Sequence, residues 1–260
     1  MAGGAVSNAP HHRSKFATNR RQLAWKTRPT KPKAHKMIPN DPALFRFRGL
    51  FGIPVQVHLS TLFLAAILIH YNSTAWDVVA ELIAFTLLML ALYLHGLGQA
   101  VVARLHRIQV RQVALSAGLS LCDTDAADPG HRMTILAMGP LTNLTFWALA
   151  SLALPLLRGE ALIWTVEVFA TLNLCLAILS LVPMRPLPGG ALIHLALSRV
   201  MPQIAADRIA GAIGLVCGAI WLPAMLLGYI FLGLTLLIVP GFSGHWRMLH
   251  LRRALGLREG

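Results

Sequence analysis

The sequence predicts an all-α fold: a polytopic transmembrane helix bundle with about six spans. Three observations predict it. Of the 260 residues, 56% are hydrophobic and only 13% are charged, whereas about 25% of residues are charged in an ordinary soluble domain. Apolar stretches of about 20 residues, the length needed to cross a hydrocarbon core of about 30 Å, recur along the chain. The basic residues lie between these stretches, as they do in membrane proteins.

Residues 1–48 are predicted to form a basic, disordered cytoplasmic tail. They hold 11 of the 23 Lys and Arg residues and no acid before Asp41, and they lack the apolar periodicity of a packed core. An Arg-rich, acid-poor segment also fits an organellar transit peptide. The alternative is a solvated arm that contacts anionic headgroups, at about 1 kcal/mol per basic residue near the surface. The first apolar block begins near Leu50, too deep for a secretory signal.

Five apolar blocks follow, and the last raises the question of one span or two. The blocks cover 53–71, 78–103, 133–157, 161–183 and 204–240. The last block is too long for one upright helix, and Leu222-Pro223 and Leu227-Gly228 offer breaks near its middle. A tight outer turn from Pro223 to Gly228 gives six spans.

Charge placement favours the six-span topology with both termini in the cytoplasm. In that topology only Arg158, of the 23 basic residues, lies outside, as the positive-inside rule requires. Residues 49–243 are then the transmembrane domain, and 244–260 form a basic amphipathic tail on the inner surface. This distribution argues for the lipid bilayer and its anionic headgroups as partners, and against nucleic acid. The expected location is the bacterial inner membrane, with an organellar membrane as the alternative.

A histidine lies inside the membrane near the end of the second predicted span. His95 precedes Arg104 by nine residues, which is about 13 Å along a helix. An ionisable residue at that depth is costly, and it suggests a functional site unless it bonds a neighbouring helix. We therefore asked whether the residues around His95 form a recognisable pattern.

Four short segments, taken together, carry a resemblance to a known family. They are Gly52-Ile53-Pro54-Val55 with His58, Leu94-His95-x-Leu97-Gly98-x-Ala100, Gly139-Pro140-Leu141-x-Asn143, and Pro183-x-x-Pro186-Leu187-x-Gly189-Gly190. In this order, over about residues 48 to 240, they resemble the site-2 protease family of intramembrane zinc metalloproteases. The resemblance implies a site-2 protease-like core.

The chain departs from the family's catalytic pattern at almost every position. In the family, a helical His-Glu-x-x-His supplies two zinc ligands and a water-activating Glu, and an Asp before paired glycines supplies the third ligand. This chain keeps the first ligand, but it replaces the activator, the second ligand, the third ligand and a family Asn; the residues at these five positions are His95, Gly96, Gln99, Pro188 and Ser180. One strong ligand cannot hold zinc, so the resemblance implies a degenerate, non-catalytic member with no cofactor.

A rebuilt metal site is the alternative for the chemistry. His95 could bind a metal together with His58 and His194, and the alternative function is then an active intramembrane zinc metalloprotease that cleaves transmembrane substrates with relocated ligands. The spacing of these histidines indicates no specific metal geometry. The sequence therefore favours a protein without enzymatic activity over an enzyme.

The favoured function is a pseudoprotease that binds or scaffolds a transmembrane segment or a membrane-protein partner. The resemblance places the partner in the groove that the family uses for cleavage, to which the third and fourth segments contribute. The candidate groove residues are Gly139, Pro140, Asn143, Gly189 and Gly190. Buried amides such as Asn143 usually bond between helices, and this is the simpler alternative for that residue.

Overall fold

The computed structural model describes residues 41–68, 74–232 and 241–250. The chain divides into two units, Met1–Met37 and Ile38–Gly260, and every described residue belongs to the second. Most of the predicted basic tail, the end of the last predicted span and the end of the C-terminal tail lie outside the described residues. They correspond to 1–40, 233–240 and 251–260.

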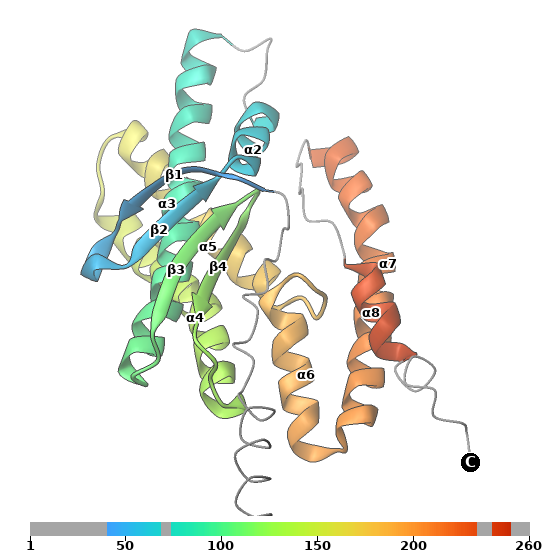
Figure 1. The fold of residues 1–260 in the computed structure, drawn as a ribbon. Helices are drawn as coiled ribbons and strands as arrows, with labels where there is room; N and C mark the ends of the chain where they lie inside the picture. Colours follow the sequence, from blue (N-terminus) through green and yellow to red (C-terminus); the bar gives the residue numbers. More distant parts are fainter. Residues whose placement is uncertain (1–40, 69–73, 233–240, 251–260) are drawn as a thin grey trace, which may run out of the picture. The chain divides into compact units, whose positions relative to one another are not determined.

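The chain is a multi-pass integral membrane protein built mainly from helices (Figure 1). The helices are α2 (Ser60–Leu68), α3 (Ala75–Leu105), α4 (Pro129–Ala153), α5 (Glu160–Leu181), α6 (Pro188–Val200), α7 (Gln203–Leu232) and α8 (Phe242–Leu249), with a short 3-10 turn η2 (Leu154–Leu156) after α4. Within the described ranges, four helices are long and apolar enough to cross a membrane: α3, α4 with η2, α5, and α7 as far as Leu227. The predicted helical membrane fold is confirmed.

A four-stranded sheet was not predicted. Its strands are β1 (Ala43–Arg48), β2 (Pro54–His58), β3 (Val110–Ser116) and β4 (Leu119–Thr124), with a 3-10 turn η1 (Leu50–Gly52) between the first two. The order is β1-β2-β3-β4, in which β2 and β3 are parallel and the outer pairs are antiparallel. The block predicted to be the first span, 53–71, therefore begins as a strand, and α2, with nine residues, is only about 13 Å long.

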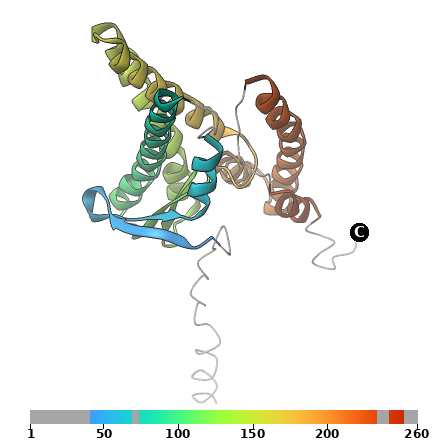
Figure 2. The same cartoon turned by 90° about the horizontal axis from the view of Figure 1, so that it is seen from above.

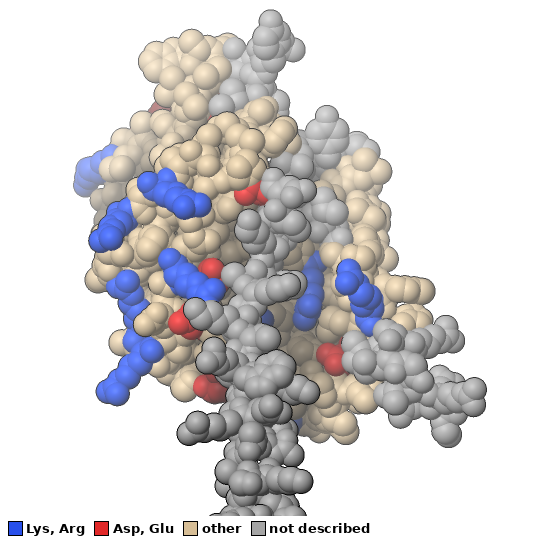
Figure 3. All heavy atoms as spheres, viewed as in Figure 1, with Lys and Arg blue, Asp and Glu red and all other residues tan. Residues whose placement is uncertain are grey.

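The sheet packs against the second half of α3, where both views place it beside that helix (Figures 1 and 2). The buried cluster between them joins Ile53, which directly precedes β2, and the strand residues Val55 and Val113 to the helix residues Ala91 and Ala100. Two hydrogen bonds fix the η1 turn to the same helix: Leu50 N–H donates to the Tyr93 hydroxyl at 2.7 Å, and the Arg104 guanidinium donates to the Phe51 carbonyl at 2.6 Å. Basic side chains gather over the strands (Figure 3).

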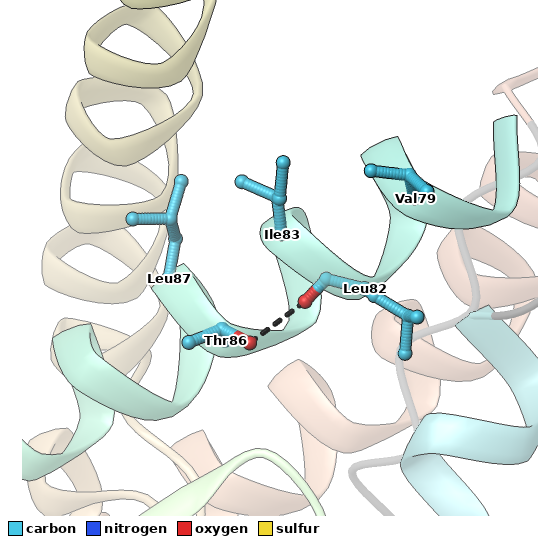
Figure 4. Close-up of a pocket in the computed structure, with 5 residues that line it drawn as sticks. All are labelled: Val79, Leu82, Ile83, Thr86 and Leu87. Atoms are coloured by element: carbon cyan, nitrogen blue, oxygen red, sulfur yellow. Dashed lines mark hydrogen bonds between the residues drawn. The ribbon is translucent and has the colours of Figure 1, made fainter. Parts of the chain in front are cut away.

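Helix α3 is divided by its surroundings into two halves. From Ala75 to Leu90 no side chain is buried, whereas nine residues between Ala91 and Ala103 are buried. The exposed half carries a shallow apolar hollow lined by Val79, Leu82, Ile83, Thr86 and Leu87, in which the Thr86 hydroxyl is bonded to the Leu82 carbonyl (Figure 4). An apolar surface of this kind fits lipid, and the buried half holds the candidate site.

The predicted turn from Pro223 to Gly228 is wrong. Helix α7 runs without interruption from Gln203 to Leu232, with Pro223 inside it. A proline removes one backbone hydrogen bond from a helix, but in a bilayer a helix has few alternatives, because exposed backbone groups find no water there. The six-span count depended on this turn, and the described ranges contain four helices of spanning length.

Candidate functional site

His95 and Gln99 lie one turn apart on α3 and meet Gly139 of α4. Both side chains are buried, and Gln99 Nε2 lies 3.4 Å from His95 Nε2. A β-carbon added at Gly139 would collide with the His95 ring and would lie 2.8 Å from Gln99 Nε2. Glycine is therefore required at this position if the imidazole is to lie between the two helices. The structure thus brings together three of the residues that sequence reasoning selected.

Gly96, at the position of the water-activating Glu, faces the sheet. A β-carbon added there would lie 2.5 Å from Val113 Cγ1 on β3 and would collide with Ser120 Oγ on β4. Real β-carbons essentially never approach other atoms so closely. The space that a side chain at residue 96 would need is occupied by the β3–β4 hairpin.

Gly98 lets α3 and α4 approach each other on a third side of the helix. A β-carbon at this residue would overlap the Thr142 hydroxyl and would lie 3.3 Å from the Met138 carbonyl oxygen. Small residues permit such close contacts between transmembrane helices. Both glycines beside His95 therefore have a packing role, Gly96 against the sheet and Gly98 against α4.

Asn143 is a fully buried amide without a hydrogen-bond partner. It lies one turn after Gly139 on α4, it has no exposed surface, and neither Oδ1 nor Nδ2 is bonded to any described residue. Ser120 Oγ beside Gly96 is likewise buried and unpartnered. Buried polar groups are nearly always hydrogen-bonded. An amide in this state can donate to and accept from the backbone of a segment bound beside it.

The turn that carries the family's third-ligand position folds back on the end of α5. Pro188 is buried and begins α6, and a proline side chain has no donor atom for a metal. A β-carbon added at Gly189 would collide with the carbonyl oxygens of Leu181 and Val182. A β-carbon added at Gly190 would lie 2.7 Å from the Met184 carbonyl carbon. Both glycines are therefore required by this turn.

Ser180, at the position of the family Asn, bonds within its own helix. Its hydroxyl donates to the Ala177 carbonyl at 2.9 Å, and the side chain is buried near the end of α5. A serine hydroxyl that is satisfied in this way has no free donor for a neighbouring segment. The polar function that the resemblance implies at this position is therefore replaced by a local hydrogen bond.

The other two histidines of the expected rebuilt metal site have different partners. His58 Nδ1 donates to the Asp41 carbonyl at 2.9 Å, and His194 Nε2 donates to Asp207 Oδ1 at 2.6 Å across the α6–α7 junction. Over residues 41–68, 74–232 and 241–250, no group of three or more His, Cys, Asp or Glu side chains lies close enough to hold a metal ion. The rebuilt site is not formed by these residues.

The residues of the β3–β4 hairpin do not replace the missing ligands. Burial, together with the charge of Asp123, raises the pKa of the Cys122 thiol to about 12, so it stays protonated at neutral pH, whereas a metal needs the thiolate. The Asp125 carboxylate accepts a hydrogen bond from the Arg111 guanidinium at 2.8 Å. Asp128 caps α4, where its carboxylate accepts from the backbone of Gly130 and His131.

The hairpin residues that close the site, Val113 and Ser120, were missed by sequence reasoning. They lie between the apolar blocks 78–103 and 133–157, in a segment for which no strand was predicted. Its signal was alternation, because Val113 and Leu115 are buried while Gln112 and Ala114 are less so. A period of two residues indicates a strand.

Relatives of this chain are found among proteins assigned as zinc metalloproteases. No protein-family model matches the chain. It is 27% identical over 207 residues to a zinc metalloprotease of Methanocaldococcus jannaschii, covering 76% of this chain and 57% of that protein. It is 33% identical over 168 residues to Rip3 of Mycobacterium tuberculosis, covering 60% of this chain and 42% of that protein. The chain thus spans about half the length of the curated relatives it matches.

A solved structure supports the same relationship at the level of the fold. The site-2 protease from Methanocaldococcus jannaschii superposes with a TM-score of 0.56 and 19% identity, over 83% of this chain and 96% of that chain. The sequence relatives and the shared fold agree with the four segments that carry the resemblance. Together they support the site-2 protease family as the family that this chain resembles in sequence and in fold.

Proposed function

We propose that this chain is a non-catalytic member of its family that binds a transmembrane segment, or a membrane-protein partner, at the surface its relatives use for chemistry. The observation that carries the proposal is the contact of Gly96 with Val113 and Ser120. The position that would activate water has no side chain, and the hairpin fills the space that one would need. A water-activating carboxylate cannot be accommodated there without moving the hairpin.

The residues present do not fit zinc. The relatives are named zinc metalloproteases, and a catalytic zinc site needs three protein ligands and one open position. Here His95 offers one imidazole, the neighbouring Gln99 offers an amide, and Pro188 offers nothing. A neutral amide oxygen is a poor ligand for a borderline-soft metal.

The same surface retains features that suit binding. The unpartnered amide of Asn143 lies one helical turn from Gly139 and Pro140, on the helix that contacts His95. Leaving its two polar atoms unsatisfied costs about 1–3 kcal/mol. Asn143 has no exposed surface, so a bound extended segment would satisfy them only after the helices around it move apart. The paired glycines at 189 and 190 keep the neighbouring turn free of side chains. A partner from within the bilayer is therefore favoured.

The exposed arginines near the sheet suit a protein whose cytoplasmic side contacts a membrane. We propose that both termini lie in the cytoplasm, with the inner membrane of a bacterium as the location. Arg46 and Arg48 on β1 and Arg104 at the end of α3 are exposed, and they would contact anionic headgroups at about 1 kcal/mol each.

The first experiment measures metal. Purified, detergent-solubilised protein and its His95→Ala variant are compared for zinc by mass spectrometry. We expect substoichiometric zinc that is the same in both. Stoichiometric zinc that disappears in His95→Ala would overturn the proposal, and would favour the alternative of an active protease with relocated ligands.

The second experiment measures binding. A photo-crosslinking amino acid is placed at Leu141, which is half exposed beside Pro140, and at Leu149 two turns further along α4 as the control, since it is similarly exposed. We expect a discrete cross-linked species from Leu141 that falls by at least about fivefold in Asn143→Leu, as loss of about 1 kcal/mol requires. Equal products from both positions, insensitive to Asn143→Leu, would contradict binding at this surface.

A further inference from the structure

The C-terminal helix α8 packs on α7 at a notch formed by two glycines. A β-carbon added at Gly211 would lie 2.8 Å from the His245 carbonyl oxygen and 3.1 Å from Met248 Cβ, and one added at Gly214 would collide with the His245 ring. His245 and Met248 are the buried residues of α8, with 2% and 8% of their surface exposed. Residues 211 and 214 must be glycine for this histidine to enter.

From the notch, α8 reaches the segment between α5 and α6. Arg185 N–H donates to His245 Nε2 at 2.8 Å, and Gly241 N–H donates to the Arg185 carbonyl at 2.8 Å. Both backbone groups of Arg185 are therefore bonded to the α8 region. On either side of Arg185, Met184 and Leu187 form a buried cluster that includes Cys217 and Trp221 of α7. Helices α7 and α8 together enclose the start of the turn that continues to Gly190.

The hydrogen bond from Arg185 determines the protonation state of His245. Because Nε2 accepts a hydrogen bond, the neutral ring must carry its proton on Nδ1, which is buried and has no partner among the described residues. A doubly protonated ring would turn a donor towards the Arg185 N–H and could not accept from it. Docking of α8 therefore requires the neutral imidazole.

The charges around His245 act in the same direction. Burial, and next the nearby Arg185, lower the pKa of His245 below its ordinary value of 6.5. Among the described side chains of α7 and α8, the other charged or titratable ones are Asp207, Arg208 and Cys217 on α7 and Arg247 and His250 on α8. Asp207 is bound to His194. A base with a depressed folded-state pKa contributes stability above its unfolded value, and this contribution is lost as the pH falls through the folded value.

We propose that His245 is a latch residue: its ring, inserted between Gly214 and Arg185, docks α8 on α7 and thereby positions the Arg185–Gly190 turn. The docking itself follows from the contacts of this chain alone. Its consequence, that α8 orders the part of the partner surface formed by Gly189 and Gly190, rests on the proposed function. His245 is thus a positioning residue and does not contact the partner.

The test follows the burial of α8 in the full-length, detergent-solubilised chain. All three native cysteines are replaced by Ser, and one reporter cysteine is introduced at Met248, which is buried against α7, or at Arg247, which is exposed on the same helix. The rate of maleimide labelling at 248 is divided by the rate at 247, so that the pH dependence of the reagent cancels. A docked α8 gives a low ratio at pH of about 8, where His245 is neutral.

Three variants separate a latch from general packing. His245→Ala removes both the ring and the acceptor, so we expect the ratio to rise about tenfold, the effect of about 1.4 kcal/mol. His245→Gln keeps an acceptor oxygen near the position of Nε2, and we expect it to restore the low ratio. Gly214→Ala should raise the ratio by crowding the ring, whereas Gly244→Ala, whose added β-carbon meets no atom within 4 Å, should not.

The pH profile distinguishes the latch from a merely structural histidine. In the His245 chain the ratio should rise as the pH is lowered from about 8 to about 5, because the undocked ring, with its ordinary pKa, takes up a proton more readily than the docked ring, whose pKa is lowered. In His245→Gln the ratio should stay low over the whole range. The proposal is overturned if the ratio in the His245 chain is independent of pH, or if Gln fails to rescue. No partner takes part in these measurements, so their outcome is independent of the partner-binding test.

Discussion

Gly96 provides the sharpest test of how the site is closed. Its α-carbon faces Val113 and Ser120, so Gly96→Ala forces one buried carbon against both. Overpacking of a well-packed core typically costs about 1–3 kcal/mol, and the mean helix-propensity gain from Gly to Ala, about 1 kcal/mol, offsets part of it. We expect Gly96→Ala to lower the free energy of unfolding by about 1–2 kcal/mol. Gly96→Glu should destabilise by several kcal/mol more, because it also buries a carboxyl group.

The assay is unfolding of the purified protein in detergent, followed by the loss of helical circular dichroism. For a chain of this size, about 1 kcal/mol corresponds to a shift of about 2–4 °C in the midpoint. Gly244→Ala, in open space, is the matched control and should not lower the midpoint. Ser120→Ala should be nearly neutral, since its hydroxyl has no partner, and should recover part of the loss in the double variant. A Gly96→Ala protein as stable as the control would refute the closed site.

Three further predictions concern other groups of the described chain. His194→Ala should lower the unfolding free energy by about 1–3 kcal/mol, because it removes the shorter hydrogen bond to the partly buried Asp207 carboxylate and leaves the longer one from Gln203 Nε2 at 3.4 Å. Asp207→Asn should lose less, and equal stability of the unsubstituted chain and both variants would refute a structural role for the pair. Asn143→Leu should leave the unfolding midpoint unchanged or higher, because it removes two unsatisfied polar atoms, and a large destabilisation would reveal an intramolecular partner. Cys122, with its pKa raised to about 12, is protonated throughout the neutral range, so it should label with maleimide at least about tenfold more slowly than a cysteine placed at the exposed Ala126.

Much of the helical framework could be predicted from hydropathy. The blocks predicted at 78–103 and 161–183 correspond to α3 and α5 within a few residues. The sheet was missed because β2 and α2 are separated by only one residue, so that strand and helix together gave an apolar block as long as a span. The alternation of Ile53, Val55 and Val57 with less buried neighbours was the signal of a strand.

Proline was misleading in the last apolar block for a physical reason. In a soluble protein, Pro223 followed by glycine at 228 is a reasonable sign of a helix end. In a bilayer, the backbone groups released by such a break have no water to bond. Helix α7 continues to Leu232 and satisfies these groups within the helix. The lack of water in the bilayer therefore outweighs the tendency of proline to end a helix.

The sequence predicts which chemical groups the site contains, but it does not predict how those groups are packed. Residue identity alone shows that position 96 carries no acid, that position 99 carries a neutral amide and that position 188 carries no donor atom. The contact of Gly96 with Val113 and Ser120 joins residues 17 and 24 positions apart in different elements, and that of His245 with Arg185 spans 60 positions. Such contacts depend on tertiary packing, and no local pattern predicts them.

Residue identity and tertiary packing together explain why restoring the family residues one at a time should not restore a metal site. Gln99→His would place a second imidazole one turn from His95, which is favourable spacing for a metal. Gly96→Glu, however, meets the hairpin, and Pro188→Asp removes the proline that begins α6. Catalytic groups of this kind act as a unit. A variant with only part of the site is therefore destabilised without gaining activity. Because residue 96 is glycine, the hairpin can pack directly against α3, so a larger side chain at this position requires the hairpin to move.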